Sequence, residues 1–220
     1  MNLGALKGSV RPLFEAGSPL RRRFEELAEN LLSRESSGCV VVTGPERGAG
    51  CTSVCLGLGA ALASMGRRAA VVDCNLAEPQ LHRMLGEPNF VGLTSALAGE
   101  KPLEHYGHEA VPGLLVVPTG PVPADPDSQI ESQRFVEVVS GLRESREVVL
   151  LDAPVAAGVL DSAALSHGFD GVLLVVHATR TAKRLARETT DSLLEAGVNL
   201  IGVVLNGVPE GAERRGEGRA

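Results

Sequence analysis

The chain has 220 residues, a length that suggests one domain and allows one sizeable core. Hydrophobic residues make up 44% of it but aromatic residues only 3%, so the core must consist mainly of Val, Leu and Ala. The formal net charge of −6 argues against a general nucleic-acid-binding surface. No apolar run reaches transmembrane length and no signal-peptide core is visible. We therefore expect a cytoplasmic protein that reaches a membrane only through a partner.

Residues 1–19 carry little periodic pattern and predict a flexible N-terminal arm. Leu20–Leu32 repeats apolar residues at helical spacing and predicts a helix. The basic run Arg21–Arg23 within it favours a solvated helix face, as charge runs usually do. At the other end, residues 208–220 predict a short disordered tail.

Between these ends, short aliphatic runs alternate with helical stretches. We expect strands at Cys39–Thr43, Ala69–Asp73, Leu114–Pro118, Val148–Asp152, Gly171–Val176 and Leu200–Asn206. We expect helices at Thr52–Met65, Gln129–Leu142, Ser162–His167 and Ala182–Ala196. This alternation predicts an α/β fold with a mostly parallel sheet and helices on both faces, whose ligands bind at the C-terminal ends of the strands.

A Gly-rich segment, Gly44–Ser53, joins the first expected strand to a helix. Such a turn presents backbone N–H groups and a helix N-terminus to phosphate, and the usual motif continues Gly-Lys-Ser/Thr. Here Gly50 and Thr52 are in place, but Cys51 stands where the lysine belongs. The loop alone could also be a tight turn that binds nothing. The expected nucleotide-binding residues of the loop are Gly48, Ala49, Gly50, Cys51, Thr52 and Ser53.

Two other strands end in carboxylates, Asp73 and Asp152. A carboxylate at this edge of the sheet is the usual seat for Mg²⁺ or for activating a nucleophile, so Thr52, Asp73 and Asp152 are the expected Mg²⁺ ligands. Each carboxylate taken alone could instead cap a helix. Their order along the chain, together with the loop, favours the functional interpretation.

These segments resemble the cytoplasmic bacterial tyrosine kinases of capsule and exopolysaccharide synthesis, which belong to the P-loop ATPases with a deviant Walker A motif. The resemblance runs from Ser18 to Asn206. Asp73–His82 is similar to the family's Walker A′ motif, and Asp152–Pro154 to Walker B. Gly202–Asn206 is similar to the strand whose last residue recognises adenine. The resemblance implies a P-loop ATPase domain over residues 20–207, with ATP or ADP and Mg²⁺ as cofactors. It also implies catalytic positions at Asp73, Asn75 and Asp152 and an adenine contact at Asn206.

Several family residues are replaced. Glu46 stands where relatives in cell division and partition carry a signature lysine, and Asn75 replaces the second Walker A′ acid. Ala77 and Glu78 replace its arginines. The family's Glu-x-x-Arg-x-x-Arg motif, which builds a ring oligomer, is absent at Arg22, Glu25 and Ala28. The family's terminal tyrosine cluster is also absent, and Tyr106 is the only tyrosine in the sequence.

These losses favour a catalytically impaired regulatory or scaffold protein of polysaccharide assembly. Its expected partner is a membrane chain-length or export protein, or an active kinase paralogue, with no nucleic acid and no ring oligomer. One alternative is an active ATPase or protein-tyrosine kinase that uses Asp73 and Asp152. Another is a partition or positioning ATPase, although Glu46 counts against it.

Other basic and thiol side chains near the expected site carry weaker signals. Nothing in the sequence directs Arg47 toward the phosphates as a substitute for the missing lysine. Arg180, Lys183 and Arg184 stand where they could reach a phosphate, but the pattern favours a solvated helix face. Cys51 at a helix N-terminus could be reactive, although an inert buried thiol is the commoner case.

Overall fold

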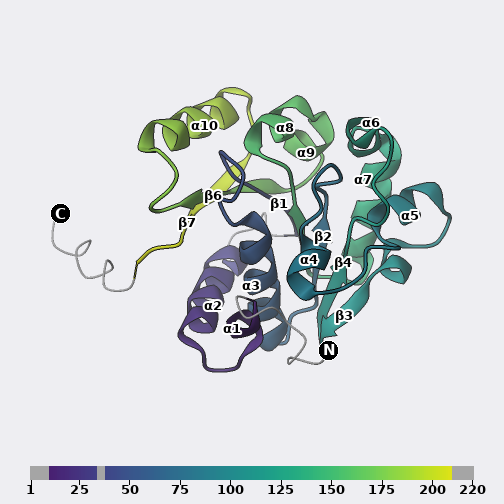
Figure 1. Ribbon diagram of the computed structural model, residues 1–220, viewed down its shortest axis with the longest axis horizontal. Helices are drawn as coiled ribbons and strands as arrows, with labels where there is room; N and C mark the ends of the chain where they lie inside the picture. Colours follow the sequence, from purple (N-terminus) through teal and green to yellow (C-terminus); the bar gives the residue numbers. More distant parts are fainter. Residues whose placement is uncertain (1–9, 34–37, 210–220) are drawn as a thin grey trace.

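A central sheet organises the computed structural model, which describes residues 10–33 and 38–209 (Figure 1). Within these residues the sheet has seven strands in the order β3-β4-β2-β5-β1-β6-β7. Neighbouring strands are parallel except β3 and β4, which are antiparallel. The strands are β1 (Cys39–Thr43), β2 (Ala69–Asp73), β3 (His108–Val111), β4 (Leu114–Val117), β5 (Val148–Asp152), β6 (Gly171–His177) and β7 (Leu200–Asn206).

Helices cover both faces of the sheet, so the expected three-layer α/β fold is confirmed. One face carries α1 (Arg11–Phe14), α2 (Pro19–Leu32), α3 (Cys51–Ser64) and α4 (Leu81–Leu85). The other carries α5 (Leu93–Ala98), α6 (Pro126–Ile130), α7 (Gln133–Ser140), α8 (Ala156–Asp161), α9 (Ala163–His167) and α10 (Lys183–Glu195). Two short 3-10 helices, η2 (Leu103–Tyr106) and η3 (Gly141–Glu144), complete the latter layer.

The central strands are aliphatic throughout because both of their faces are buried. In β1, Val40 and Val42 pack toward α1–α4, while Cys39 and Val41 pack toward the opposite helices. All four side chains are fully buried. A strand buried on both faces has no need of alternating polar residues, which is why the aliphatic runs located these strands correctly.

The less regular elements differ from expectation. Strand β3 has only four residues and is half-exposed, so it carries no aliphatic run. The single helix expected at Gln129–Leu142 is divided, because α6 ends at Ile130 and Ser132 starts a new helix. The Ser132 hydroxyl caps α7 by accepting a hydrogen bond from the Phe135 N–H at 3.1 Å. Helix α8 was not anticipated.

The N-terminal segment also differs from the expected arm. Val10, Leu13 and Phe14 are buried in the core beside α3, so residues 10–19 pack as part of the fold. Arg21 is not solvated either: it is only 8% exposed, and its Nη1 donates to the Leu13 carbonyl at 3.3 Å. Residues 1–9 and 210–220, which include most of the two predicted flexible ends, lie outside the described residues. None of the helices in the described ranges combines the length and apolar character needed to cross a bilayer.

Helix α2 docks on α3 at a glycine. A Cβ atom added to Gly57 would overlap the ring of Phe24. We therefore expect Gly57→Ala to push this ring aside and lower the free energy of unfolding by about 1–3 kcal/mol, measured by denaturant titration. Gly141→Ala is the control, because an added Cβ there meets nothing within 4 Å and the backbone is already right-handed helical. Equal stability of the two variants would contradict this account of the α2–α3 contact.

Candidate nucleotide site

The loop between β1 and α3 has the shape of a phosphate loop. Gly48 and Gly50 adopt positive φ angles of 78° and 102°, which side chains other than glycine rarely adopt. Gly50 is the N-cap of α3, and its carbonyl accepts a hydrogen bond from the Val54 N–H at 2.9 Å. The first N–H groups of this 14-residue helix are therefore turned toward the loop, as anion binding requires.

Cys51 is the first residue of α3, and its partly buried side chain packs against the core. Burial, and secondarily the nearby Asp152, raise the pKa of Cys51 to about 12. The thiol is therefore protonated at neutral pH and supplies neither the cation of a Walker lysine nor a nucleophilic thiolate. Burial outweighs the helix N-terminus, which argues against the alternative of a reactive cysteine.

Two carboxylates lie side by side beneath the loop. Strands β2 and β5 are paired so that Asp73 and Asp152 are direct neighbours, and both side chains are buried. Burial raises the pKa of Asp73 to about 6, although three backbone N–H donors partly oppose the shift. Burial and the charge of Asp73 raise the pKa of Asp152 well above its usual range, against a hydrogen bond from Thr52. Ionising both carboxylates at once is therefore unfavourable in this site.

Asp73 also shapes the Walker A′ segment. Its Oδ1 accepts from the Asn75 N–H at 3.2 Å, and its Oδ2 accepts from Gln80 and Leu81 N–H groups at 3.1 and 3.0 Å. The last two donors begin α4, so Asp73 caps that helix from a distance. The capping alternative raised by the sequence is therefore realised for Asp73, and it coexists with the position beside Asp152.

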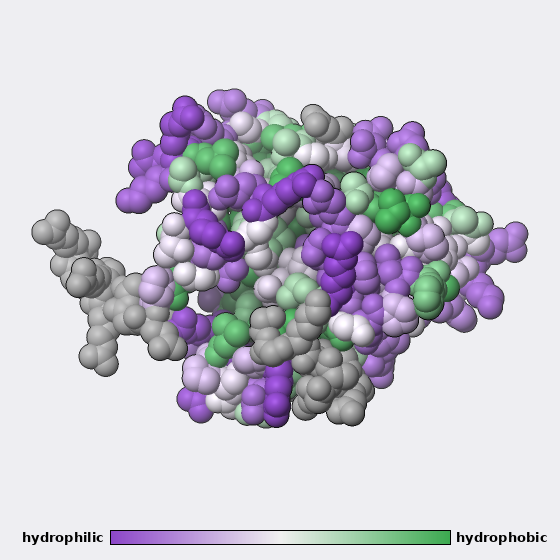
Figure 2. Space-filling view, in the orientation of Figure 1, coloured by the Kyte–Doolittle hydropathy of each residue, from purple (hydrophilic) through white to green (hydrophobic). Residues whose placement is uncertain are grey.

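The rim of the site comes from the last two strands. Asn206 at the end of β7 donates from Nδ2 to the Ala49 carbonyl at 2.9 Å. It rests on Gly50, where an added Cβ would overlap it. Arg180 follows β6 and donates from Nη2 to the Gly48 carbonyl at 2.6 Å. On the face shown in Figure 2, hydrophilic side chains border a hollow over this region.

These residues surround a cavity of about 430 Å³. Of the residues predicted for the site, the cavity is lined by Gly48, Ala49, Gly50, Cys51, Thr52, Ser53, Asn75, Asp152 and Asn206. Asp73 does not line it but lies next to Asp152. Arg180, Glu78 and Gln80 line the cavity as well, although the sequence did not single them out as site residues. Glu78 and Gln80 lie within the Walker A′ segment, and Arg180 was among the basic residues that the sequence placed within reach of a phosphate.

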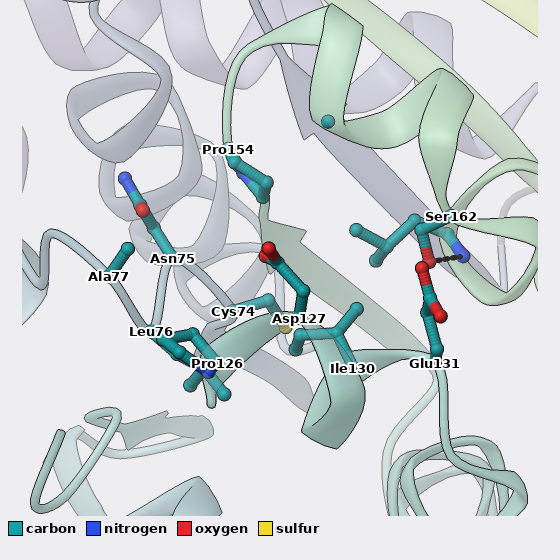
Figure 3. A pocket seen from close by; sticks show the side chains of 12 residues that line it. Cys74, Asn75, Leu76, Ala77, Pro126, Asp127, Ile130, Glu131, Pro154 and Ser162 are labelled. Carbon is teal, nitrogen blue, oxygen red and sulfur yellow. Dashed lines mark hydrogen bonds between the residues drawn. The ribbon is translucent and has the colours of Figure 1, made fainter. Parts of the chain in front are cut away.

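A second, smaller cavity of about 210 Å³ lies on the far side of Asn75 (Figure 3). The Asp127 side chain comes from α6 and points into this space, whereas Glu131, in the turn after α6, extends toward Ser162. Pro154, which follows β5, lines the same space. The Walker A′ segment therefore separates the phosphate cavity from a second, acidic one.

The residues present fit a magnesium-bound nucleotide in part. The loop backbone, the Thr52 hydroxyl and the two carboxylates are hard oxygen ligands and N–H donors of the kind such a ligand takes. Within the described residues, no three His, Cys, Asp or Glu side chains converge as a metal site. A Mg²⁺ ion here would therefore need phosphate and water oxygens in addition to protein ligands. What the cavity lacks is the lysine.

Comparison with known proteins agrees with this geometry. The family model described as "Cellulose biosynthesis protein BcsQ" matches residues 38–200. A putative tyrosine-protein kinase EpsB from Ralstonia solanacearum is 35% identical over 211 residues, which cover 96% of this chain. The chain spans only 27% of that relative's own length.

Solved structures agree as well. The crystal structure of the chimerical protein CapA2B2 superposes with a TM-score of 0.83 at 26% identity, over 93% of this chain and 92% of the other. The septum site-determining protein MinD of Pyrococcus horikoshii, in complex with Mg-ADP, shares the fold with a TM-score of 0.60. It is 21% identical over 76% of this chain and 69% of its own. The chain therefore belongs to the bacterial tyrosine kinase family of P-loop proteins.

Proposed function

We propose that this chain is a catalytically impaired member of its family that binds nucleotide weakly and acts as a regulatory or scaffold partner in exopolysaccharide or capsule assembly. One observation carries the proposal: a protonated thiol, Cys51, occupies the lysine position above two buried carboxylates. Phosphoryl transfer depends mainly on positioning and on neutralising the charge of the phosphates. At this position the protein supplies no cation.

The Walker A′ segment supports the same proposal. Asn75 cannot accept a proton as a carboxylate would, and its Oδ1 already accepts from the Glu78 N–H at 3.3 Å. Asp73 is committed to three backbone N–H groups. A general base in this site would have to be Asp152, Asp73 released from its capping role, or one of the cavity-lining glutamates Glu46 and Glu78.

The surface of α2 supports a partner other than a ring of identical copies. At the positions of the family's oligomer motif, Ala28 is fully buried against the core and Glu25 is paired with Arg21 at 3.2 Å. Ala28 is therefore unavailable to a second copy, whereas Glu25 is partly exposed and Arg22 is exposed. EpsB carries the matched segment within a much longer chain, and CapA2B2 is a chimerical protein, so in both the matched domain lies beside other protein segments. The partner's proposed identity is a membrane chain-length or export protein, or an active kinase paralogue.

An active ATPase or kinase remains the second candidate, because Thr52 still donates to Asp152 and both carboxylates are kept. This candidate predicts ATP turnover that disappears in Asp152→Asn. Phosphate release measured on the purified chain, with that variant as the blank, distinguishes it from the impaired protein. Turnover that survives in Asp152→Asn would point to a contaminating ATPase.

Restoring the lysine tests the first proposal. We expect Cys51→Lys to bind Mg-ADP about 10- to 100-fold more tightly than the native chain, because a charged contact at a desolvated site contributes about 1.5–3 kcal/mol. Isothermal calorimetry measures both affinities. Cys51→Met fills similar space without a charge and should stay near the native value. Native affinity equal to that of Cys51→Lys would refute the inference drawn from the thiol.

The uncompensated carboxylate pair predicts an unusual pH dependence. The folded-state pKa of Asp73 lies near 6 and that of Asp152 well above its usual range, so the folded chain holds protons that the unfolded chain has released. Unfolding free energy should therefore fall as pH rises from about 4 through 6 and beyond. We expect Asp152→Asn to raise the melting temperature at pH 8 and to flatten this dependence.

Thermal unfolding at pH 5 and pH 8 without Mg²⁺ measures the effect. Asp191→Asn removes an exposed carboxylate on α10 and serves as the control, with no comparable gain expected. A melting temperature of Asp152→Asn at or below the native value at pH 8 would show that the repulsion between the carboxylates is already neutralised.

A further inference from the structure

Two guanidinium groups, Arg47 and Arg180, line the phosphate cavity. They differ in what they contact. Arg47 lies on the loop itself, and its Nη1 is 2.5 Å from Oε1 of Glu78 in the Walker A′ segment. This ion pair engages the Arg47 guanidinium with a carboxylate of the Walker A′ segment. Arg47 is thereby a poor replacement for the lysine, in agreement with the sequence analysis.

Arg180 is placed differently. Its Nη2 donates to the Gly48 carbonyl, and its Nη1 is 3.8 Å from the position that a Cβ of Gly48 would take. Among the residues that the structure describes, no carboxylate lies within ion-pair distance of it. A guanidinium has five N–H donors, so one bond to a carbonyl leaves most of its hydrogen-bonding capacity and its whole charge unused.

The turn that carries Arg180 is held in place at several points. The Thr181 hydroxyl accepts from the His177 N–H at 3.1 Å, and the Thr181 N–H donates to the His177 carbonyl at 3.1 Å. The Ala178 N–H donates to the Asn206 carbonyl at 2.7 Å, which ties the turn to the end of β7. Asn206 in turn contacts the loop at Ala49. The base of Arg180 is therefore fixed beside the phosphate loop rather than free in solvent.

We propose that Arg180 is the cation that binds the nucleotide's phosphates in this chain, in place of the lysine lost at Cys51. The inference rests on the proposed retention of nucleotide binding. Arg180 approaches the loop from the outside, through Gly48, whereas a residue at position 51 would approach from the start of α3. Arg180 therefore supports binding of a nucleoside di- or triphosphate without restoring the positioning that a Walker lysine gives during transfer. Arg180 is exposed, as expected for a solvated face, and it also lines the phosphate cavity.

The test is a titration of the full chain with a fluorescent ADP analogue in excess Mg²⁺. We compare the native protein with Arg180→Gln, Arg180→Lys, Arg47→Gln and Arg187→Gln. We expect Arg180→Gln to weaken binding about tenfold or more, because a charge-assisted bond to phosphate is lost. Arg180→Lys keeps the positive charge but loses the planar guanidinium with its several donors. Its affinity for the analogue should lie between those of Arg180→Gln and the native protein. Arg187→Gln removes an exposed charge on α10 outside the cavity and should bind as the native chain does.

Competition by inorganic pyrophosphate gives a second readout that a merely structural role would not change. The affinity for pyrophosphate should be lower in Arg180→Gln than in the native chain, by about the same factor as the affinity for the ADP analogue. A loss in Arg180→Gln no larger than in Arg187→Gln, or a larger loss in Arg47→Gln, overturns the inference and leaves the proposed weak nucleotide binding intact. If the native chain binds no analogue while Cys51→Lys does, nucleotide retention itself fails, and the role of Arg180 fails with it. Melting temperatures of all variants, measured beforehand, identify any loss that comes from unfolding.

Discussion

The pairing of β2 with β5 is the constraint on which the rest of the site depends. Because these strands are parallel and in register at their ends, Asp73 and Asp152 must be neighbours. Both are buried, which makes each costly to ionise, and the charge of Asp73 adds to the cost of ionising Asp152. Strand β1 pairs on the other side of β5, so the phosphate loop begins directly above this pair. A cation would ordinarily be needed between such carboxylates and a polyphosphate.

In place of a single lysine, several side chains from different segments make separate contacts around the phosphate loop. Asp73 gives its oxygens to the backbone of the Walker A′ segment and the start of α4. Arg47 is paired with Glu78, and the exposure of both side chains limits this pair to a small contribution to stability. Arg180 and Asn206 bind consecutive carbonyls of the loop from outside. Hydrogen bonds from the residues that end or follow β6 and β7 therefore hold the loop in shape. The guanidinium of Arg180 lies at the rim of the cavity rather than at the start of α3.

The N-terminal helix α2 packs against α3 and against the segment that precedes α2. Phe24 packs over Gly57, Ala28 faces the core, and Arg21 joins α2 to the carbonyl of Leu13. These contacts use the surface of α2 for intramolecular packing. Of the three positions of the oligomer motif, only Ala28 takes part in this packing, while Arg22 stays exposed and Glu25 partly exposed.

The sequence by itself determined the fold class, the positions of the six aliphatic strands and the residues that form the phosphate loop. Aliphatic runs buried on both faces and Gly-rich turns are local patterns that can be recognised without the tertiary structure. Strand ends, which meet at one edge of a parallel sheet, located Asp73 and Asp152. The Gly-rich loop located Cys51, and the family resemblance pointed to Asn206. Only the tertiary structure decided how these residues are used. The pKa of Cys51, the capping of α4 by Asp73 and the different partners of Arg47 and Arg180 depend on burial and on contacts between segments far apart in the chain. The packing of residues 10–19 and the short strand β3 were likewise set by neighbours that no local pattern reveals.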